Sequence, residues 1–293
     1  MHSIVDLQIE EFKEISLKYD AFIIDLWGVI HNGFVAYTGS VECINHLIEI
    51  GKPIIFMSNA PRPNTVVLKK LLELEINANL EMVLTSGDTT RIFLIENLIK
   101  TPNKKYYHLG AHRNTDLLID INICLTEDIQ QCDAILLTAY IDEHEDLEQF
   151  NDILKQAADL KIPIICSNPD KIVINGVKNR YCAGFLAEKY EMLGGTVYYY
   201  GKPHLTIYDI GLDKLKLKGI YDKNKILMIG DTLETDIQGA INVGIKSALV
   251  LTGNTNNLLI KYNQLTKTKT ETLKDLLDNY KIYPTHVISG LRY

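Results

Sequence analysis

The chain has 293 residues, and its 30 basic and 37 acidic side chains give a formal net charge of −7. Hydrophobic residues make up 46% and charged residues 23%, which excludes collagen-like and disordered chains and allows a large core with one inserted domain. The pI is near 5.6 and the basic residues are not clustered, so the chain lacks the basic patch that is typical of proteins that bind nucleic acid or a membrane surface.

The cysteine pattern and the N-terminal stretch bear on the compartment. The five cysteines are widely spaced and form no CxxC pair, which argues against a disulfide framework and a zinc knuckle. Residues 1–19 carry four acidic side chains, unlike a signal or transit peptide. No apolar run approaches the roughly 20 residues that a transmembrane helix needs. We therefore expect a soluble, cytoplasmic protein.

Short apolar runs alternate with helical patterns, which predicts an α/β fold with a doubly wound parallel sheet. The runs are continuous rather than alternating, which is typical of strands buried on both faces. The predicted elements of the first region are helix Leu7–Lys18, strand Ala21–Leu26, helix Val41–Glu49, strand Pro53–Met57, helix Asn64–Leu74, strand Glu81–Thr85 and a helix from Ser86 through Ile99.

A second α/β region interrupts this pattern. Its predicted elements are strands Tyr106–Leu109, Ala134–Thr138 and Pro163–Cys166 and helix Leu147–Leu160. The chain is then expected to return to the first sheet with a helix through Met192, strand Val197–Tyr200, a helix after Pro203, and strands Ile226–Ile229, Ala248–Leu251 and His286–Ile288. The sequence therefore predicts a core of residues 1–86 and 188–293 and an inserted α/β domain of residues 87–187.

Four polar segments follow predicted strands, where open α/β sheets bind ligands. They are Asp25-Leu26-Trp27-Gly28-Val29, Ser58-Asn59, Gly201-Lys202-Pro203 and Gly230-Asp231-Thr232-Leu233-Glu234-Thr235-Asp236. Each segment by itself is also typical of a turn or a helix cap. Their combination is more informative, because two carboxylates, a hydroxyl and an ammonium at one sheet edge suit Mg²⁺ and a phosphoryl group.

The same segments indicate a reaction. A carboxylate such as Asp25 can attack phosphorus and form an aspartyl-phosphate, which divides hydrolysis into two easier displacements. Lys202 and the cation would offset the charge of the transferred group. Gly28 would leave room for close backbone approach.

In this order, the four segments resemble the motifs of the haloacid dehalogenase (HAD) superfamily of hydrolases. The resemblance implies a HAD-like Rossmannoid core, Mg²⁺ as cofactor and a small phosphorylated substrate. It also implies residue roles: Asp25 as nucleophile and metal ligand, the Trp27 carbonyl and Asp231 as further metal ligands, Ser58, Asn59, Gly28 and Lys202 as phosphate-site residues, and Asp236 as a supporting residue.

The insertion resembles the class IIA cap of phosphatases similar to NagD. Asn168-Pro169-Asp170, Ala183-Gly184 and Gly201-Lys202-Pro203 are similar to the segments at the cap exit of that branch. The resemblance implies a cap that closes over the substrate and sets specificity, and a homodimer formed through the cap as in other members of the branch.

One residue departs from the pattern of the phosphatases. The second residue after their nucleophile is usually an Asp that acts as general acid and base, whereas this chain has Trp27. An indole N–H donates a hydrogen bond but does not exchange a proton near neutral pH. His31 is the nearest replacement and His204 a weaker one, although a loop histidine bonded to backbone is the commoner case.

The sequence therefore predicts a Mg²⁺-dependent phosphatase of small phosphorylated metabolites such as sugar or nucleotide monophosphates. Trp27 keeps two alternatives open. One is a catalytically weak protein that binds metal and phosphate esters or has a regulatory role. The other is a metal-independent haloacid dehalogenase, because those enzymes carry an aromatic residue at the same position.

Overall fold

The computed structural model describes residues 8–142, 147–175, 178–262 and 268–293. The chain divides into two compact units. Unit 1 comprises Met1–Met57, Lys70–Met82 and Tyr208–Tyr293, and unit 2 comprises Ser58–Lys69 and Val83–Ile207. Within the described ranges, every helix is too short or too polar to span a lipid bilayer.

Unit 1 contains a parallel sheet in which the strands run in the order β1-β15-β14-β13-β2-β3. These strands are β1 (Ile9–Glu10), β2 (Ala21–Ile24), β3 (Ile54–Ser58), β13 (Ile226–Gly230), β14 (Lys246–Val250) and β15 (His286–Ile288). Every residue of β2, β3 and β13 is buried, as the continuous apolar runs predict. The expected α/β parallel-sheet fold is confirmed.

The strand register brings several strand ends to one edge of this sheet. Ile24, the last residue of β2, pairs with Ile229 of β13 on one side and with Phe56 of β3 on the other. Because all three strands are parallel, the residues that follow them lie at the same carboxyl edge. Asp25 comes directly after β2, and Asp231 comes directly after β13.

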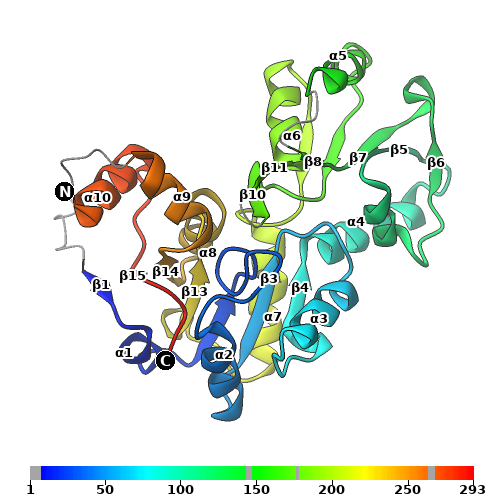
Figure 1. Ribbon diagram of the computed structural model, residues 1–293. Coiled ribbons are helices and arrows are strands. Elements are labelled where there is room, and N and C mark those ends of the chain that lie inside the picture. The colour runs from blue at the N-terminus through cyan, green and yellow to red at the C-terminus, as the bar shows by residue number, and fades with distance from the viewer. Residues whose placement is uncertain (1–7, 143–146, 176–177, 263–267) are drawn as a thin grey trace. The chain divides into compact units, whose positions relative to one another are not determined.

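Helices connect the strands of unit 1. They are α1 (Phe12–Ser16), α2 (Ser40–Glu49), α8 (Gln238–Val243), α9 (Gly253–Tyr262) and α10 (Lys269–Tyr280), while α3 (Asn64–Glu73) and α7 (Leu205–Leu217) have residues in both units. Figure 1 shows α9 and α10 beside β14 and β15, and buried leucines of both helices pack on Leu249 and Val287 of these strands. This packing covers one face of the sheet.

Unit 2 contains a second parallel sheet, in the order β12-β9-β7-β5-β6. Its strands are β5 (Lys105–Gly110), β6 (Cys124–Thr126), β7 (Ala134–Thr138), β9 (Ile164–Cys166) and β12 (Val197–Tyr199). An antiparallel sheet, β10-β11-β8, is formed by β8 (Tyr140–Asp142), β10 (Ile172–Asn175) and β11 (Lys178–Cys182). The remaining strand of the unit is β4 (Val83–Thr85).

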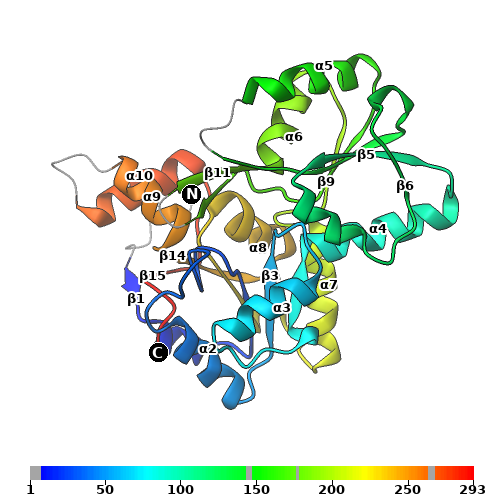
Figure 2. The same ribbon diagram turned by 45° about the vertical axis from the view of Figure 1, so that its right-hand side comes forward.

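Both faces of the second parallel sheet are covered. On one face, α5 (Asn151–Asp159) and α6 (Ala183–Met192) pack on buried residues of β7 and β9. On the other face, α4 (Ser86–Lys100) and the 3₁₀ segment His112–Leu118 contribute Leu94 and Leu117. Figure 2 shows α5 and α6 above this sheet and α4 below it. The insertion therefore has a doubly wound core of its own.

Two predicted elements are wrong in part. The helix expected over Leu7–Lys18 begins outside the described residues, and its central part forms β1 and then the short α1. Ile9 and Glu10 pair with Val287 and Ile288 of β15, so a strand partner distant in sequence overrides the local helical pattern.

The Tyr-rich strand was expected to return the chain to the first sheet. Instead, Val197–Tyr199 pairs with Ile164–Cys166 of β9 in the second sheet. Strand periodicity does not reveal which sheet a strand joins, since that depends on its partner. The insertion was predicted to end near Ala187, which lies before β12, the strand that pairs with β9 at one edge of the second sheet. In the structure, unit 2 continues to Ile207.

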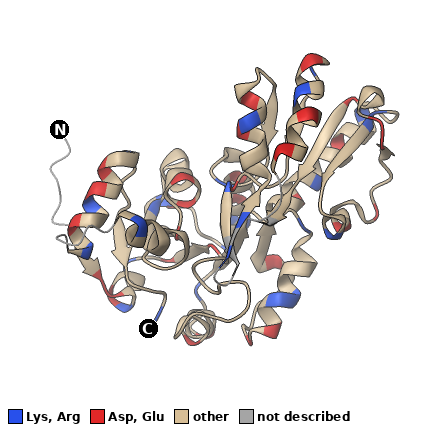
Figure 3. Cartoon of the chain, turned by 45° about the horizontal axis from the view of Figure 1, so that its top comes forward, with Lys and Arg blue, Asp and Glu red and all other residues tan. Residues whose placement is uncertain are grey.

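Charged residues of both signs are distributed over both units. Figure 3 shows basic and acidic residues interspersed on the helices, as the sequence composition leads us to expect.

Candidate active site

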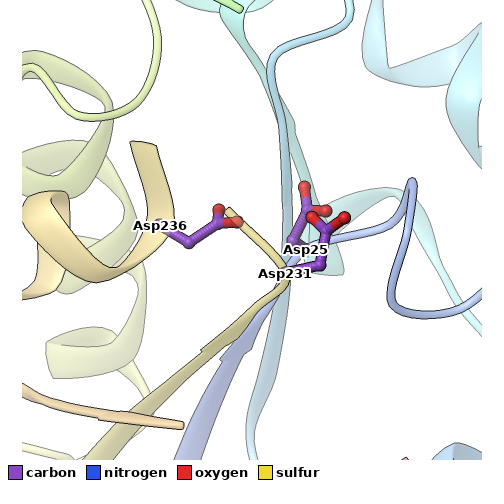
Figure 4. A group of neighbouring side chains, drawn as sticks. All are labelled: Asp25, Asp231 and Asp236. Carbon is purple, nitrogen blue, oxygen red and sulfur yellow. The ribbon is translucent and has the colours of Figure 1, made fainter. Parts of the chain in front are cut away.

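Three buried carboxylates gather at the carboxyl edge of the first sheet. Asp25 follows β2, Asp231 follows β13, and Asp236 lies in the helical turn Leu233–Ile237 (Figure 4). They are 6%, 2% and 1% exposed, and one oxygen from each lies within 4.8 Å of the others. The structure thus brings together three of the residues predicted from the sequence.

Polar groups from two segments hold Asp231 in place. The backbone N–H of Asn254 donates to Oδ2 of Asp231 at 2.6 Å, and the Thr232 hydroxyl donates to Oδ1 at 3.1 Å. The Thr255 hydroxyl donates to the Asp231 carbonyl. The Thr232 N–H donates to Oδ2 of Asp236 at 3.1 Å, which ties the second carboxylate to the same turn.

Two glycines make room for the Asp231 carboxylate. Gly28 has φ +92° and Gly253 has φ +51°, and a Cβ added to either residue would collide with the carboxylate oxygen Oδ2 of Asp231. The Thr252 hydroxyl also donates to the Gly28 carbonyl at 2.5 Å, so the two loops are joined. Gly28 was predicted to allow close backbone approach, and in the structure the group that approaches is Asp231.

The electrostatics of the cluster fit a divalent cation. Burial, and then the neighbouring carboxylates of Asp25 and Asp236, raise the pKa of Asp231 well above its usual range. Three oxygen donors of like charge in a buried space repel one another, and a hard cation offsets that repulsion. The donor set consists of oxygen only, which suits Mg²⁺ or Ca²⁺ better than a metal that prefers nitrogen or sulfur.

Trp27 and His31 form the turn that follows Asp25. Their rings pack edge to face with centroids 5.3 Å apart, and the Gly28 N–H donates to the His31 carbonyl at 2.9 Å. His31 Nδ1 accepts the Gly33 N–H at 3.0 Å. Burial, and then the charge of Lys70, lower the pKa of His31 to about 4, so the ring is neutral near neutral pH. This arrangement favours a role in holding the loop over a role as proton donor.

Unit 2 brings together the predicted residues Asn59 and Lys202. Asn59 Oδ1 accepts the Lys202 N–H at 2.7 Å, and Asn59 Nδ2 donates both to the Lys202 carbonyl at 3.0 Å and to Oδ1 of Asp170 at 2.8 Å. Lys202 is only 2% exposed. The Ser58 hydroxyl accepts the Ala60 N–H at 3.1 Å. Asn59 therefore positions the Lys202 backbone, a role that the sequence did not predict.

His204, the weaker candidate for proton transfer, packs against an aromatic ring. It stacks on Tyr199 with centroids 4.9 Å apart and an interplanar angle of 3°. Burial lowers the pKa of His204. The ring is thus part of the packing at the end of β12.

Sequence reasoning missed the Thr252-Gly253-Asn254-Thr255 segment that surrounds Asp231. The signal was present, because this small and polar run follows the apolar strand Ala248–Leu251 at the same sheet edge. It went unused because nothing local distinguishes it from an ordinary loop before a helix.

The fold and the site together define an α/β protein with an oxygen-only acidic cluster at the carboxyl edge of its first parallel sheet. Comparison with known proteins agrees. The profile described as haloacid dehalogenase-like hydrolase matches residues 22–124, and the profile described as HAD-hydrolase-like matches residues 199–292.

Individual proteins are similar over most of the chain. An acid sugar phosphatase of Staphylococcus epidermidis is 29% identical over 243 residues, which cover 80% of this chain and 87% of that protein. A haloacid dehalogenase-like hydrolase from Brucella suis has a TM-score of 0.80 at 28% identity, covering 97% of this chain and 99% of the other. NagD from E. coli has the same fold, with a TM-score of 0.64 at 20% identity over 93% and 97% of the two chains.

The chain therefore belongs to the haloacid dehalogenase-like hydrolases, and it is a phosphatase of that superfamily. The predicted family and enzyme class are confirmed.

Proposed function

We propose that this phosphatase is Mg²⁺-dependent and hydrolyses small phosphorylated metabolites such as sugar or nucleotide monophosphates. The observation that carries the proposal is the buried cluster of Asp25, Asp231 and Asp236 at the carboxyl edge of the first sheet. The name of the staphylococcal relative, acid sugar phosphatase, supports sugar phosphates as the first class to test.

In the proposed reaction, a carboxylate oxygen of Asp25 forms a bond to phosphorus while the bond from phosphorus to the substrate oxygen breaks. The products are an aspartyl-phosphate and the alcohol, and water then hydrolyses the acyl phosphate to free phosphate and the Asp25 carboxylate. Asp25, Asp231 and the Trp27 carbonyl would hold Mg²⁺, which offsets the charge of the transferred group when bound. Ser58 and Lys202 would bind the phosphoryl oxygens, and Asp236 would support the turn that carries Asp231.

Trp27 affects the rate of this reaction rather than its type. Neither the indole nor the neutral His31 ring provides a proton, so the leaving alkoxide takes its proton from water in this scheme. General acid assistance is typically worth about 10²–10⁴ in rate, and its loss slows substrates with poor leaving groups the most. A weak phosphatase that mainly binds its ligand is accordingly the second candidate.

The acidic cluster argues against the dehalogenase alternative. A nucleophile that attacks carbon without a metal gains nothing from two further buried carboxylates beside it, whereas a cation site needs them. Phosphoryl transfer therefore remains the proposed reaction.

The test is phosphate release from 4-nitrophenyl phosphate and from sugar and nucleotide monophosphates, with Mg²⁺ and with chelator. We expect turnover that needs the metal and that falls about a thousandfold or more in Asp25→Asn. The matched control is Asp20→Asn, since Asp20 is an exposed aspartate of the same unit. Activity close to that of the unsubstituted protein in Asp25→Asn would refute the nucleophile, and metal-independent halide release from a 2-haloacid offered in a parallel assay would support the dehalogenase.

A further inference from the structure

The second parallel sheet has a topological switch point. In the order β12-β9-β7-β5-β6, the chain passes from β5 to β6 on one side and then to β7 on the other side of β5. Open α/β sheets bind ligands outside the carboxyl ends of the two strands at such a point. Here those strands are β5, which ends at Gly110, and β7, which ends at Thr138.

The two strand ends are held closely together. Gly110 pairs with Thr138, and a Cβ on Gly110 would collide with the Thr138 hydroxyl oxygen. His108 Nε2 and the Thr138 hydroxyl are 2.7 Å apart, and Asn114 Nδ2 donates to the Thr138 carbonyl at 2.7 Å. The segments that leave the strands therefore start from a fixed position.

These segments carry a cation and an aromatic ring that contact each other. Arg113 lies in the 3₁₀ segment after β5, and Tyr140 begins β8 after β7. The Arg113 guanidinium lies over the Tyr140 ring, with Cζ 4.3 Å from the centroid. Arg113 is exposed, and a guanidinium carries five N–H donors, so contact with the Tyr140 ring and phenol leaves further donors for a carboxylate or phosphate.

A second guanidinium belongs to the same group. Tyr140 pairs with Cys182 of β11, and Arg180 lies two residues before Cys182, hence on the same face of that strand. Burial raises the pKa of Tyr140, while the charge of Arg113, a hydrogen bond from Arg113 and the charge of Arg180 oppose this rise. Asp142, opposite Arg180 in register, is the acidic residue of the paired strand.

The carboxyl edge of this sheet also leads to Lys202. β9 ends at Cys166, and Asp170, four residues later, accepts the hydrogen bond from Asn59 that was described above. Asn59 in turn holds both the N–H and the carbonyl of Lys202. Backbone hydrogen bonds join this segment to the end of β11, because the Cys182 N–H donates to the Lys171 carbonyl at 2.9 Å and the Gly184 N–H donates to the Asp170 carbonyl at 3.1 Å.

We propose that Arg113, Arg180 and Tyr140 form a subsite for a second anionic group of the substrate. The preferred substrate is then a phosphomonoester that also carries a carboxylate or a second phosphate. This inference rests on the proposed function, because it takes the Ser58 and Lys202 segments as the place of the reacting phosphate. The arginines act on substrate choice and not on the bond-breaking step.

The test compares substrates that differ by one anion. Glycerol 3-phosphate against 3-phosphoglycerate tests a carboxylate, and glucose 6-phosphate against glucose 1,6-bisphosphate tests a second phosphate. We expect kcat/KM to favour the doubly anionic member of at least one pair by about tenfold to a hundredfold, the range for one charge-assisted hydrogen-bonded pair. The pair that shows the preference identifies the second anion.

Variants assign that preference to the subsite. Arg113→Ala is expected to bring the ratio within each preferred pair close to one, and Arg113→Lys to keep part of it, since the charge remains but the planar fork is lost. Lys155→Ala is the matched control, because it removes an exposed positive charge from α5 of the same unit. A preference that survives Arg113→Ala, or that falls equally in Lys155→Ala, would overturn the proposal.

A binding measurement separates this proposal from the proposed reaction. Calorimetric dissociation constants for the same compounds, measured in Asp25→Asn with and without Arg113→Ala, do not depend on turnover. If no substrate is hydrolysed but the doubly anionic compounds bind more tightly through Arg113, the subsite stands and the reaction is wrong. If hydrolysis occurs and both members of every pair react and bind equally, the reaction stands and the subsite is wrong.

Discussion

The two parallel sheets of this protein share an architecture and differ in the charge at their carboxyl edges. The edge of the first sheet carries Asp25, Asp231 and Asp236, all buried. The edge of the second sheet leads into Arg113, which is exposed, and Arg180, which is half-buried. The architecture supplies a place where strand ends converge, whereas the side chains that follow the strands decide whether that place suits a cation or an anion.

Burial explains why the two edges need different support. Carboxylates that are buried together repel one another unless a cation lies between them. At the first edge, Gly28 and Gly253 leave space for the Asp231 carboxylate, and the Asn254 N–H holds it in place by a hydrogen bond. The exposed Arg113 guanidinium keeps much of its hydration, and its contact with the Tyr140 ring orients it. Disturbing the acidic edge should therefore affect chemistry, and disturbing the basic edge should affect selectivity.

Among substitutions that leave the carboxylates themselves in place, the largest effect is expected for Gly28→Ala. The new Cβ would collide with Asp231, and a displacement of about 1 Å at a reacting centre costs about a hundredfold in rate. We expect kcat to fall by about that factor or more with the fold retained, measured with 4-nitrophenyl phosphate and circular dichroism. Gly51→Ala is the control, because Gly51 also has a positive φ but nothing within 4 Å of its added Cβ. An equal loss in both variants would mean that backbone strain is the cause.

Thermal unfolding tests the cation separately from activity. At a Mg²⁺ concentration of about 100 times Kd, binding stabilises the folded state by about 2.7 kcal/mol, which raises Tm by about 5–10 °C. Asp231→Asn should lose this rise because one ligand of the buried cluster is neutral, while Asp20→Asn should keep it. A Tm of the unsubstituted protein that does not respond to Mg²⁺, Mn²⁺ or Ca²⁺ would contradict a cation site at the acidic edge.

Trp27→Asp is expected to increase activity. An aspartate at this position restores a proton donor, and the gain should be about tenfold for alkyl phosphates and smaller for 4-nitrophenyl phosphate, which has a good leaving group. The measurement is kcat for both classes of substrate. Trp27→Asn, which has a similar shape but no acidic proton, should show no gain. A gain in both variants would show that removing the indole, rather than adding an acid, is responsible.

The smallest effect concerns His31 and the stability of the acidic edge at low pH. The pKa of His31 is lowered to about 4 in the folded protein, whereas its ordinary pKa is 6.5. Below about pH 6.5 the unfolded chain therefore binds more protons at His31 than the folded protein does. The stability that depends on a neutral His31 is fully present above about pH 6.5 and is lost as the pH falls toward 4. Between about pH 7.5 and 5.5, the free energy of unfolding should fall by about 1 kcal/mol from this residue.

Urea unfolding at several pH values measures this contribution. His31→Gln should reduce the dependence of unfolding free energy on pH by about this amount, while His112→Gln, at an exposed histidine, should not. An unchanged pH dependence in His31→Gln would contradict the buried, neutral ring.

Much of the acidic site could be predicted because its parts are local. An apolar strand followed by Asp25, or by Asp231 and Asp236, is visible in a short window of sequence, and parallel pairing then brings such strand ends to one edge. The roles of Asn59 and Asn254 could not be predicted in this way. Each acts through hydrogen bonds to residues distant in the chain, Lys202 and Asp231, and such pairings depend on the fold.

By itself, the sequence determined that this protein has buried parallel strands, that carboxylates follow two of them, and that tryptophan replaces the usual acid. These properties depend on residue type and on spacing within a few positions. The tertiary structure alone decided that Ile9–Glu10 forms a strand, that Val197–Tyr199 joins the second sheet, and that Arg113 meets Tyr140. The physical reason is that strand pairing and side-chain contacts form between segments far apart in the chain, and their free energy is not contained in either segment alone.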